Sequence, residues 1–266
     1  MLLSNERIRE IFAEVNAIIT DGHFVYSKKP DGWYHGYEYV NKDAIYLYPG
    51  YVSDLCVKIA WHFVDSGVQV VVGPTVGGAI LAQWIPYWLS SFVEEPREIL
   101  AVCADEEDVL EQRDTVLGFG EKFLVNGIVK VECQSGFGFL GHLFKAQFPS
   151  KVGTRRVIKR GYDVHIKGKQ CLIVEDVINS GATVAKTAEA ITIAGGNIVG
   201  VGALCNRSGG KVNAQTLGVP ELFSLIDLDM QMFREEDCPI CKERGIKSVR
   251  TDLGKGKEFL ARMGKS

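Results

Sequence analysis

CLIVEDVINSGATV, residues 171–184, predicts a buried strand, a turn and the start of a helix. Its first four residues are apolar, which is typical of a strand covered on both faces, and two acids follow them, Glu175 and Asp176. After two more apolar residues come Asn-Ser-Gly-Ala-Thr and a helical pattern that ends at Gly195-Gly196. A strand that runs through a turn into a helix is the repeating unit of a parallel α/β sheet.

Similar strands recur elsewhere in the chain. They are VQVVVG (68–73), NIVGVGALCN (197–206) and LFSLIDLDM (222–230). Together with QCLIVED (170–176) they predict an α/β fold with a mainly parallel, twisted sheet and helices on both faces. Ligands bind such sheets at the carboxyl ends of the strands. The positions where chemistry is expected are therefore residues 73–78, 175–183 and 205–210.

The turn that follows Asp176 suits a sugar phosphate. Carboxylates at a strand end can accept hydrogen bonds from sugar hydroxyls, and Ser180 and Thr183 offer hydroxyls at a helix N-terminus. Backbone N–H groups at that terminus favour an anion, with charge-assisted hydrogen bonds of about 1.5–3 kcal/mol each. Gly181 permits the positive φ that such a turn needs. The alternative is a plain strand–helix turn with N-capping residues.

This segment resembles the PRPP signature of type I phosphoribosyltransferases, in which four hydrophobic residues precede two acids and a Thr/Ser-Gly-rich turn. The resemblance implies that Glu175 and Asp176 hold the ribose hydroxyls of phosphoribosyl pyrophosphate (PRPP). It also implies the fold of that family, with a small N-terminal hood and, in this chain, an inserted β-rich segment. The residues that it assigns to the 5-phosphate are Val177, Ile178, Asn179, Ser180, Gly181, Ala182 and Thr183.

A second glycine-rich turn supports the same resemblance. VVVGPTVGGAILA, residues 70–82, is similar to the pyrophosphate-binding turn of the orotate branch, where a strand ends in Gly-Pro and a glycine follows. By this resemblance Thr75, Val76, Gly77 and Gly78 bring backbone N–H groups to the diphosphate. Family members often carry a lysine at the position of Gly77, so one charged contact is missing here. An ordinary glycine turn is the alternative.

The N-terminal segment and the third strand supply the expected base contacts. GHFVYSKKPDGWYHGYEYVNKDA, residues 22–44, resembles the hood of orotate phosphoribosyltransferases, and Lys42 occupies the position of a basic hood residue. The strand ALCNR ends at Arg207, where orotate enzymes place an arginine near the carboxylate of the base. The resemblance therefore assigns Asn179, Arg207 and Tyr39 to the base. A strand-end arginine in solvent is the alternative for Arg207.

The catalytic lid departs most from the family pattern. Orotate enzymes carry a basic, glycine-rich loop before the PRPP strand, whereas this chain has the shorter KRGYDVHIKGKQ. Laid on the family pattern, Lys159 and Arg160 become the expected diphosphate contacts. With Glu175, Asp176 and Lys42 they form the predicted catalytic set, which acts by positioning and electrostatics without a protein nucleophile. The resemblance implies Mg²⁺ bound through the substrate and no separate protein metal site for it.

Composition shifts along the chain predict its organisation. The expected segments are 1–50 with a helix and the hood, 51–230 with the phosphoribosyltransferase core, an insertion at about 94–157 within that core, and 231–266 with a Cys-x-x-Cys tail. Helices are expected at 5–18 and at 53–66, the second with Ser53 as its N-cap. Turns are expected at Pro30-Asp31-Gly32 and at Pro49-Gly50.

The composition also excludes several classes of protein. The 266 residues carry 30 Lys+Arg against 33 Asp+Glu, and 46% are hydrophobic, which argues against a disordered chain and against non-specific nucleic-acid binding. Residues 66–93 have no formal charge, but Gly73-Pro74, Gly77-Gly78 and Pro86 interrupt them, so a buried strand and helix are favoured over a membrane span. The seven cysteines indicate reduced thiols in a cytoplasmic protein.

GFGFLG, residues 136–141, matches the Gly-x-Gly-x-x-Gly pattern of dinucleotide-binding turns. The segment after it is too short for the helix of such a site, and two phenylalanines stand where backbone must approach the ligand. A glycine-punctuated hairpin built from residues 123–133 and 137–148 is therefore favoured over NAD binding.

CPIC, residues 238–241, has the spacing of metal ligands. One such pair is half of a tetrahedral zinc site, so Cys238 and Cys241 would need further ligands. Cys205, Cys103 or Cys133 could supply them, but the sequence does not bring any of these together. Buried thiols are the favoured interpretation, and a structural zinc is the alternative.

The function that these patterns predict is PRPP-dependent transfer of ribose 5-phosphate to orotate, giving orotidine 5′-monophosphate and pyrophosphate in pyrimidine nucleotide synthesis. Two alternatives stay open: transfer to another base, and a PRPP or nucleotide sensor that has lost catalysis. The expected partners are small molecules and a second copy of the chain in a homodimer, with no nucleic acid and no membrane.

Overall fold

The fold is described from a computed structural model that covers residues 2–26, 28, 29, 31–92, 98–117, 130–134 and 143–264. The chain divides into two compact units. The first unit comprises Met1–Asp105 with Ile158–Ser266, and the second comprises Glu106–Val157.

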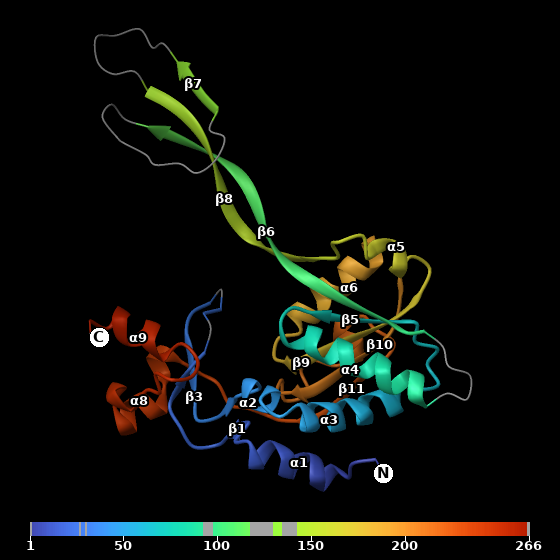
Figure 1. Cartoon of the computed structure of the whole chain (residues 1–266). Coiled ribbons are helices and arrows are strands. Elements are labelled where there is room, and N and C mark those ends of the chain that lie inside the picture. The colour runs from blue at the N-terminus through green and yellow to red at the C-terminus, as the bar shows by residue number, and fades with distance from the viewer. Residues whose placement is uncertain are drawn as a thin grey trace. The chain divides into compact units, whose positions relative to one another are not determined.

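The elements follow one another in the order labelled in Figure 1. Those before the second unit are α1 (Asn5–Glu14), β1 (Ile18–Ile19), β2 (Phe24–Val25), β3 (Tyr34–Gly36), β4 (Tyr39–Val40), α2 (Asp43–Tyr46), α3 (Pro49–His62), β5 (Val70–Pro74) and α4 (Gly77–Ser91). Next come β6 (Leu100–Leu117), β7 (Lys130–Gln134) and β8 (Leu143–Val157). The remainder are α5 (Asp163–Ile166), β9 (Gln170–Ile178), α6 (Ala182–Ile193), β10 (Asn197–Asn206), α7 (Ala214–Leu217), β11 (Leu222–Asp227), β12 (Phe233–Arg234), η1 (Glu235–Asp237), α8 (Pro239–Arg244), η2 (Ile246–Ser248) and α9 (Gly256–Arg262).

The centre of the first unit is a parallel sheet, as predicted. Its strand order is β11-β10-β9-β5-β6, and each of these neighbouring pairs is parallel. The strands predicted at 68–73, 170–176, 197–206 and 222–230 are β5, β9, β10 and β11. Because β5 and β9 are neighbours in the centre of the sheet, the two turns that follow them open at the same edge.

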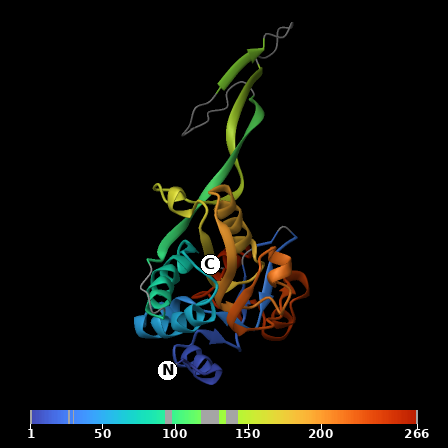
Figure 2. The same cartoon turned by 90° about the vertical axis from the view of Figure 1, so that its right-hand side faces the viewer.

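Apolar residues on both faces of the central strands explain why helices cover both sides. Val71 and Leu172 belong to one core with helices α1, α3 and α4. Val70 and Ile173 belong to another core with helices α5 and α6. In two views α6 lies across the sheet from α3 and α4 (Figures 1 and 2). Strands buried on both faces read as continuous apolar runs, which is why the sequence predicted them.

Three helix boundaries differ from the prediction, and one of them is the end of the helix expected at 53–66, which lies at His62. Pro49 and Gly50 begin helix α3 instead of forming a turn, because proline is favoured in the first turn of a helix, where its missing N–H costs nothing. Ser53 is therefore inside the helix and not its N-cap; its Oγ accepts a hydrogen bond from Trp88 Nε1 at 3.1 Å. The predicted helix 5–18 is present but ends at Glu14, and Ile18 starts the short strand β1.

In the second unit, β7 and β8 pair in antiparallel register from Lys130↔Gln147 to Gln134↔Leu143. This pairing agrees with the predicted hairpin. The glycine pattern at 136–141 lies outside the described residues.

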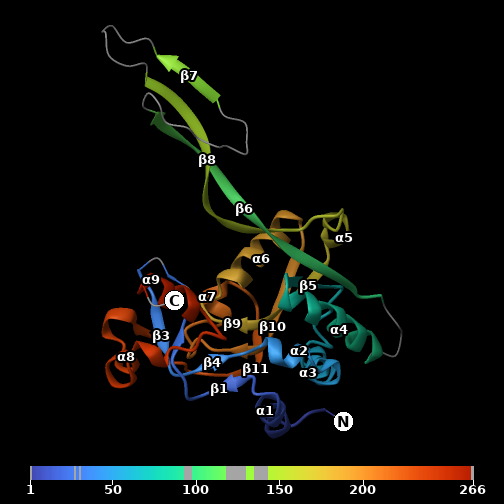
Figure 3. The same cartoon turned by 60° about the vertical axis from the view of Figure 1, so that its left-hand side comes forward.

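The hood and the C-terminal tail of the first unit share a small sheet of order β12-β3-β2 (Figure 3). Phe233 of the tail pairs with His35 of the hood, and Val25, Val249 and Phe259 form a separate small core there. The tail is therefore folded against the hood. None of the described helices combines the length and the apolar character that crossing a membrane requires.

Candidate active site

The two acids of the PRPP-like segment lie near the end of β9 and are almost fully buried, with Glu175 6% and Asp176 3% exposed. Asp176 Oδ2 accepts hydrogen bonds from Lys42 Nζ at 2.6 Å and from the Tyr46 hydroxyl at 3.0 Å. Its Oδ1 accepts one from the backbone N–H of Val177 at 2.7 Å. A buried carboxylate needs such partners, and here the hood residue Lys42 provides the charged one.

Burial and the charge of Asp176 shift the pKa values of the side chains around it. Burial, reinforced by the neighbouring charge of Asp176, raises the pKa of Glu175 to about 8. Burial alone would lower the pKa of Lys42, but the charge of Asp176 and the hydrogen bond to it raise that pKa above its ordinary value. Burial and the charge of Asp176 also raise the pKa of Tyr46. Without a ligand, burial therefore disfavours the charged form of Glu175, while Lys42 keeps its positive charge against Asp176.

The turn between β9 and α6 has the geometry that the sequence predicted. Gly181 is the N-cap of α6 with φ +75°, and the backbone N–H of Ala182 donates to Ser180 Oγ at 3.5 Å. Ser180 is exposed and Thr183 is half-buried, so both lie at the surface of the turn. Ile178 is 1% exposed and packs in the core, so only its backbone could face a ligand.

The second predicted turn, between β5 and α4, lies directly against the acids. A Cβ at Gly77 would stand 1.6 Å from Asp176 Oδ2 and 2.6 Å from the Tyr46 hydroxyl. A Cβ at Gly78 would stand 2.5 Å from the carbonyl of Val174. No side chain fits at either position, which gives a physical reason for glycine where the family often has lysine.

The other two residues of this turn differ in exposure. Thr75 is anchored, since its backbone N–H donates to the carbonyl of Ala104 at 3.0 Å. Val76 is 76% exposed at the tip of the turn.

A cavity of about 610 Å³ opens beside the turn between β9 and α6. It is lined by residues of the hood, of the β9–α6 turn, of the end of β10 and of the tail. The lining residues are Tyr26, Lys28, Lys29, Tyr39, Val40, Lys42, Val177, Asn179, Ser180, Arg207, Met232, Gly254 and Lys255. All three residues predicted to contact the base are among them. Five of the lining residues are lysine or arginine and none is acidic, so the cavity favours an anion.

Tyr26 fixes one wall of this cavity. Its ring is buried and lies 5.1 Å from the guanidinium carbon of Arg207, a cation–π contact. Its hydroxyl donates to the backbone carbonyl of Glu38, and burial raises the pKa of Tyr26 to about 12. Arg207 is thus held over an aromatic face at the end of β10 instead of extending into bulk solvent, which was the alternative interpretation.

The predicted lid residues do not line the cavity. Of the described residues, those that line it include neither Lys159 nor Arg160, and Glu175, Asp176 and the turn at residues 75–78 do not line it either. Arg160 has φ +62° and its Nη2 lies 2.9 Å from Asp105 Oδ2. The structure thus brings together Lys42, Glu175 and Asp176 of the predicted catalytic set, but not the two lid residues.

Comparison with known proteins relates the chain to one family. Residues 163–231, which include β9, α6 and β10, match the phosphoribosyl transferase domain. In this segment the chain is similar to phosphoribosyltransferases. A mainly parallel sheet with helices on both faces is also what the resemblance to the type I phosphoribosyltransferases predicted.

Three proteins that this chain is similar to over most of its length are named orotate phosphoribosyltransferase. The protein from Caldanaerobacter subterraneus subsp. tengcongensis is 27% identical over 248 residues, which are 93% of this chain and 97% of the relative. The protein from Chlorobaculum parvum is 27% identical over 241 residues, 91% of this chain and 92% of the relative. The protein from Thermotoga petrophila is 28% identical over 236 residues, 89% of this chain and 92% of the relative.

The CPIC pair has neighbours that the sequence analysis missed. Its side chains lie with His23 and His35 of the hood, whereas Cys103 and Cys205 are outside this cluster. The cysteines proposed as partners are therefore the wrong ones, apart from Cys133, whose side chain is not among those described. The hood segment contains two histidines, His23 and His35, which are common zinc ligands. The sequence-based prediction named only cysteines as further ligands.

Proposed function

We propose that this chain transfers the 5-phosphoribosyl group of PRPP to orotate. In this reaction the bond between C1 of the ribose and the pyrophosphate oxygen breaks, and a bond from C1 to a ring nitrogen of orotate forms. The products are orotidine 5′-monophosphate and pyrophosphate. The observation that carries the proposal is the basic cavity, in which hood residues and Arg207 face the turn between β9 and α6.

The β9–α6 turn supports a role in holding PRPP. The N-terminus of α6, with Gly181 in the left-handed region, offers backbone N–H groups to the 5-phosphate. Glu175 and Asp176 would accept hydrogen bonds from the ribose hydroxyls. Lys42, already on Asp176, would supply positive charge close to the breaking bond. The glycine turn at residues 75–78 would face the diphosphate, because Gly77 touches Asp176.

The oxygen atoms available at this site suit Mg²⁺. The ion prefers hard oxygen ligands, which the phosphate and hydroxyl oxygens of PRPP would supply, while Glu175 and Asp176 would hold those ribose hydroxyls in place. When bound with PRPP, Mg²⁺ neutralises charge on the leaving pyrophosphate. The protein residues position the substrate and exclude water around it.

Arg207 supports orotate over a base without a carboxylate. A guanidinium held over Tyr26 at the cavity wall can bind a carboxylate through two parallel hydrogen bonds. Tyr39 and Asn179 line the same cavity and could contact the pyrimidine ring. Transfer to another base would need a different partner for Arg207.

One observation favours a sensor that binds PRPP without catalysis. Arg160 Nη2 lies 2.9 Å from Asp105 Oδ2, so the charge of this predicted lid residue is paired with an acid of the protein. A site without its lid residues would hold PRPP but assist the departure of pyrophosphate poorly.

Steady-state assays with PRPP, Mg²⁺ and a panel of bases test both functions. Orotidine 5′-monophosphate formation, with orotate preferred over uracil and adenine, is the expected result. PRPP binding in calorimetry without turnover of any base would establish the sensor instead. Absence of PRPP binding would overturn both. A homodimer in the cytoplasm is also proposed from the family resemblance, and sedimentation of the full chain tests the dimer.

A further inference from the structure

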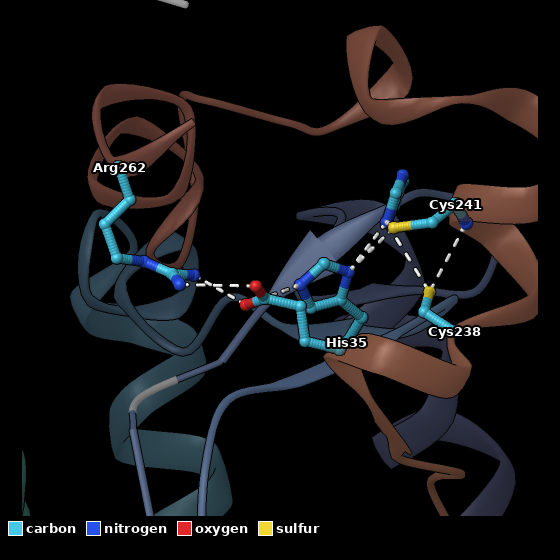
Figure 4. A network of polar contacts seen from close by, with 6 residues as sticks. His35, Cys238, Cys241 and Arg262 are labelled. Carbon is cyan, nitrogen blue, oxygen red and sulfur yellow. Dashed lines mark hydrogen bonds and ion pairs between the residues drawn. The ribbon is translucent and has the colours of Figure 1, made fainter. Parts of the chain in front are cut away.

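Four metal-binding side chains meet away from the cavity. They are His23, His35, Cys238 and Cys241, and their ligand atoms all lie within 4.8 Å of one another. His35 is in β3 of the hood, whereas the two cysteines flank the start of α8 in the tail (Figure 4). Three of the four are buried and Cys241 is half-buried. The phosphoribosyl transfer proposed above uses none of them.

We propose that these four side chains bind one zinc ion in a structural Cys₂His₂ site. Two thiolates and two imidazoles complete a tetrahedral shell without water, which is the pattern of structural and not catalytic zinc. The Cys-x-x-Cys spacing supplies one half, as in other structural zinc sites. The backbone N–H of Cys241 donates to Cys238 Sγ at 3.4 Å, so the first thiolate also has a backbone partner.

The distances between the donor atoms match such a shell. Zinc bond lengths in a regular tetrahedron place sulfur about 3.6 Å from nitrogen and two nitrogens about 3.3 Å apart. Cys241 Sγ lies 3.5 Å from His23 Nε2 and 3.4 Å from His35 Nδ1. Cys238 Sγ lies 3.8 Å from His23 Nε2, and the two nitrogens are 3.0 Å apart. The cluster is thus already close to the size that one zinc ion requires.

The ring of His23 is oriented by a hydrogen bond on its far side. The hydroxyl of Ser248 donates to the carbonyl of Gly245 at 2.6 Å, so its oxygen is left to accept from His23 Nδ1 at 2.7 Å. His23 therefore carries its proton on Nδ1 and turns the lone pair of Nε2 toward the cluster. Metal-binding histidines are commonly fixed by such an outer partner.

His35 distinguishes a metal site from a simple pair of histidines. Without a metal, His35 Nδ1 would donate its proton to His23 Nε2, and His35 Nε2 would be an acceptor. That atom is buried and has no hydrogen-bond partner among the described residues; its neighbour is Glu235 Oε2, an acceptor at 3.7 Å. With zinc on Nδ1 the proton moves to Nε2 and faces this carboxylate, which Arg262 holds in turn (Figure 4).

The proposed zinc would fasten the tail to the hood beside the cavity. Both histidines are in the hood, and Lys255 of the tail donates its backbone N–H to the carbonyl of Val25 at 2.7 Å. Gly254 and Lys255 line the cavity. The ion would hold this wall in place without touching the substrate.

The test is the metal content of the purified full chain, produced without an affinity tag that binds metal. We expect about one zinc per chain by mass spectrometry in the wild type and in Cys103→Ser, which changes a half-buried cysteine outside the cluster. In Cys241→Ser and in His35→Gln the zinc content should fall at least about tenfold. Wild-type protein without zinc, in which Cys238 and Cys241 react freely with a thiol reagent, would overturn the proposal.

Cobalt exchange covers the case in which the variants fail to fold. Co²⁺ in the wild-type chain should give the strong visible bands of a tetrahedral site and a thiolate-to-cobalt charge-transfer band, and Cys103→Ser should give the same spectrum. Weak octahedral bands without charge transfer would contradict the site. These readouts do not depend on PRPP or on turnover, so their result is separate from that of the proposed function.

Discussion

Lys42 and Asp176 are 134 residues apart in the chain, yet Lys42 Nζ lies 2.6 Å from Asp176 Oδ2. This ion pair connects the hood to the strand that carries the PRPP-like signature. Because Asp176 is buried, the pair is shielded from solvent on the carboxylate side and couples the position of the hood to that of the acid.

Replacing Lys42 by methionine should lower kcat/KM for PRPP by about 10²–10³-fold, the loss typical when one charged or hydrogen-bonding group is removed from a reacting centre. Asp176 keeps its hydrogen bonds from Tyr46 and Val177, so the fold should persist. Steady-state kinetics and circular dichroism measure the two effects. The matched control is Lys58→Met in α3, which should leave kcat/KM unchanged; equal effects of both variants would contradict the assignment of Lys42.

The double variant Glu175→Gln, Asp176→Asn should abolish turnover while keeping the shape of both side chains. The carboxylates are the proposed acceptors for ribose hydroxyls, and amides would present donors in their place. Turnover is measured by the orotate-dependent release of pyrophosphate. Unchanged turnover would remove both acids from the site.

Glu175→Gln alone should change how stability depends on pH. The pKa of Glu175 is raised in the folded protein to about 8, so between pH about 4.5 and 8 the folded state holds a proton that the unfolded state has released. Stability contributed by this group is present below pH 4.5 and is lost as pH rises through 8, with a slope of up to about 1.4 kcal/mol per pH unit.

The glutamine variant has no such proton to lose. Its unfolding free energy in urea should therefore rise relative to wild type across this pH range and hold a constant difference above it. Glu189→Gln, an exposed change on α6, serves as the control for surface charge. A difference that stays flat from pH 4.5 to 8 would contradict the raised pKa.

Gly77→Ala should impair PRPP binding, because the added Cβ would collide with Asp176 Oδ2 and displace the acid or the turn. Overpacking of this kind costs about 1–3 kcal/mol. The matched control is Gly50→Ala in α3, where a Cβ meets nothing within 4 Å and should stabilise the protein by about 0.4–1 kcal/mol. Calorimetric titration with PRPP and thermal unfolding measure both; equal PRPP affinity in the two variants would count against the turn.

Arg207→Met should weaken the preference for orotate over uracil, which lacks the carboxylate. Loss of a charge-assisted contact of about 1.5–3 kcal/mol corresponds to a change of about 10- to 150-fold in kcat/KM for orotate. The value for uracil should change little. Arg9→Met in α1 should alter neither base, and an equal loss for both bases in Arg207→Met would show that Arg207 does not read the carboxylate.

Local patterns predicted the parallel sheet because its strands are buried on both faces and read as uninterrupted apolar runs. They also predicted the left-handed Gly181, since a strand–helix turn of this length needs a positive φ. The start of α3 was wrong because Pro49-Gly50 reads equally well as a turn and as a helix start. Only tertiary packing between α3 and α4, including Trp88 on Ser53, distinguishes the two.

Contacts between distant segments could not be predicted in the same way. The residues near Gly77 in the sequence do not indicate that Asp176 packs against it. The glycine at the family's lysine position was therefore interpreted only as the loss of a charged contact. His23 and His35 are 12 residues apart and lie far from the cysteines along the chain. It is the pairing of β12 with β3, between Phe233 and His35, that brings the tail to them.

The hood-to-tail sheet also has a consequence for the order in which the chain is made. The cavity takes walls from Tyr26 and Tyr39 at one end of the sequence and from Gly254 and Lys255 at the other. When the ribosome has synthesised the last strand of the parallel sheet, the residues that form this wall of the cavity have not yet been made. A chain that ended between residues 231 and 253 would therefore lack this wall of the cavity.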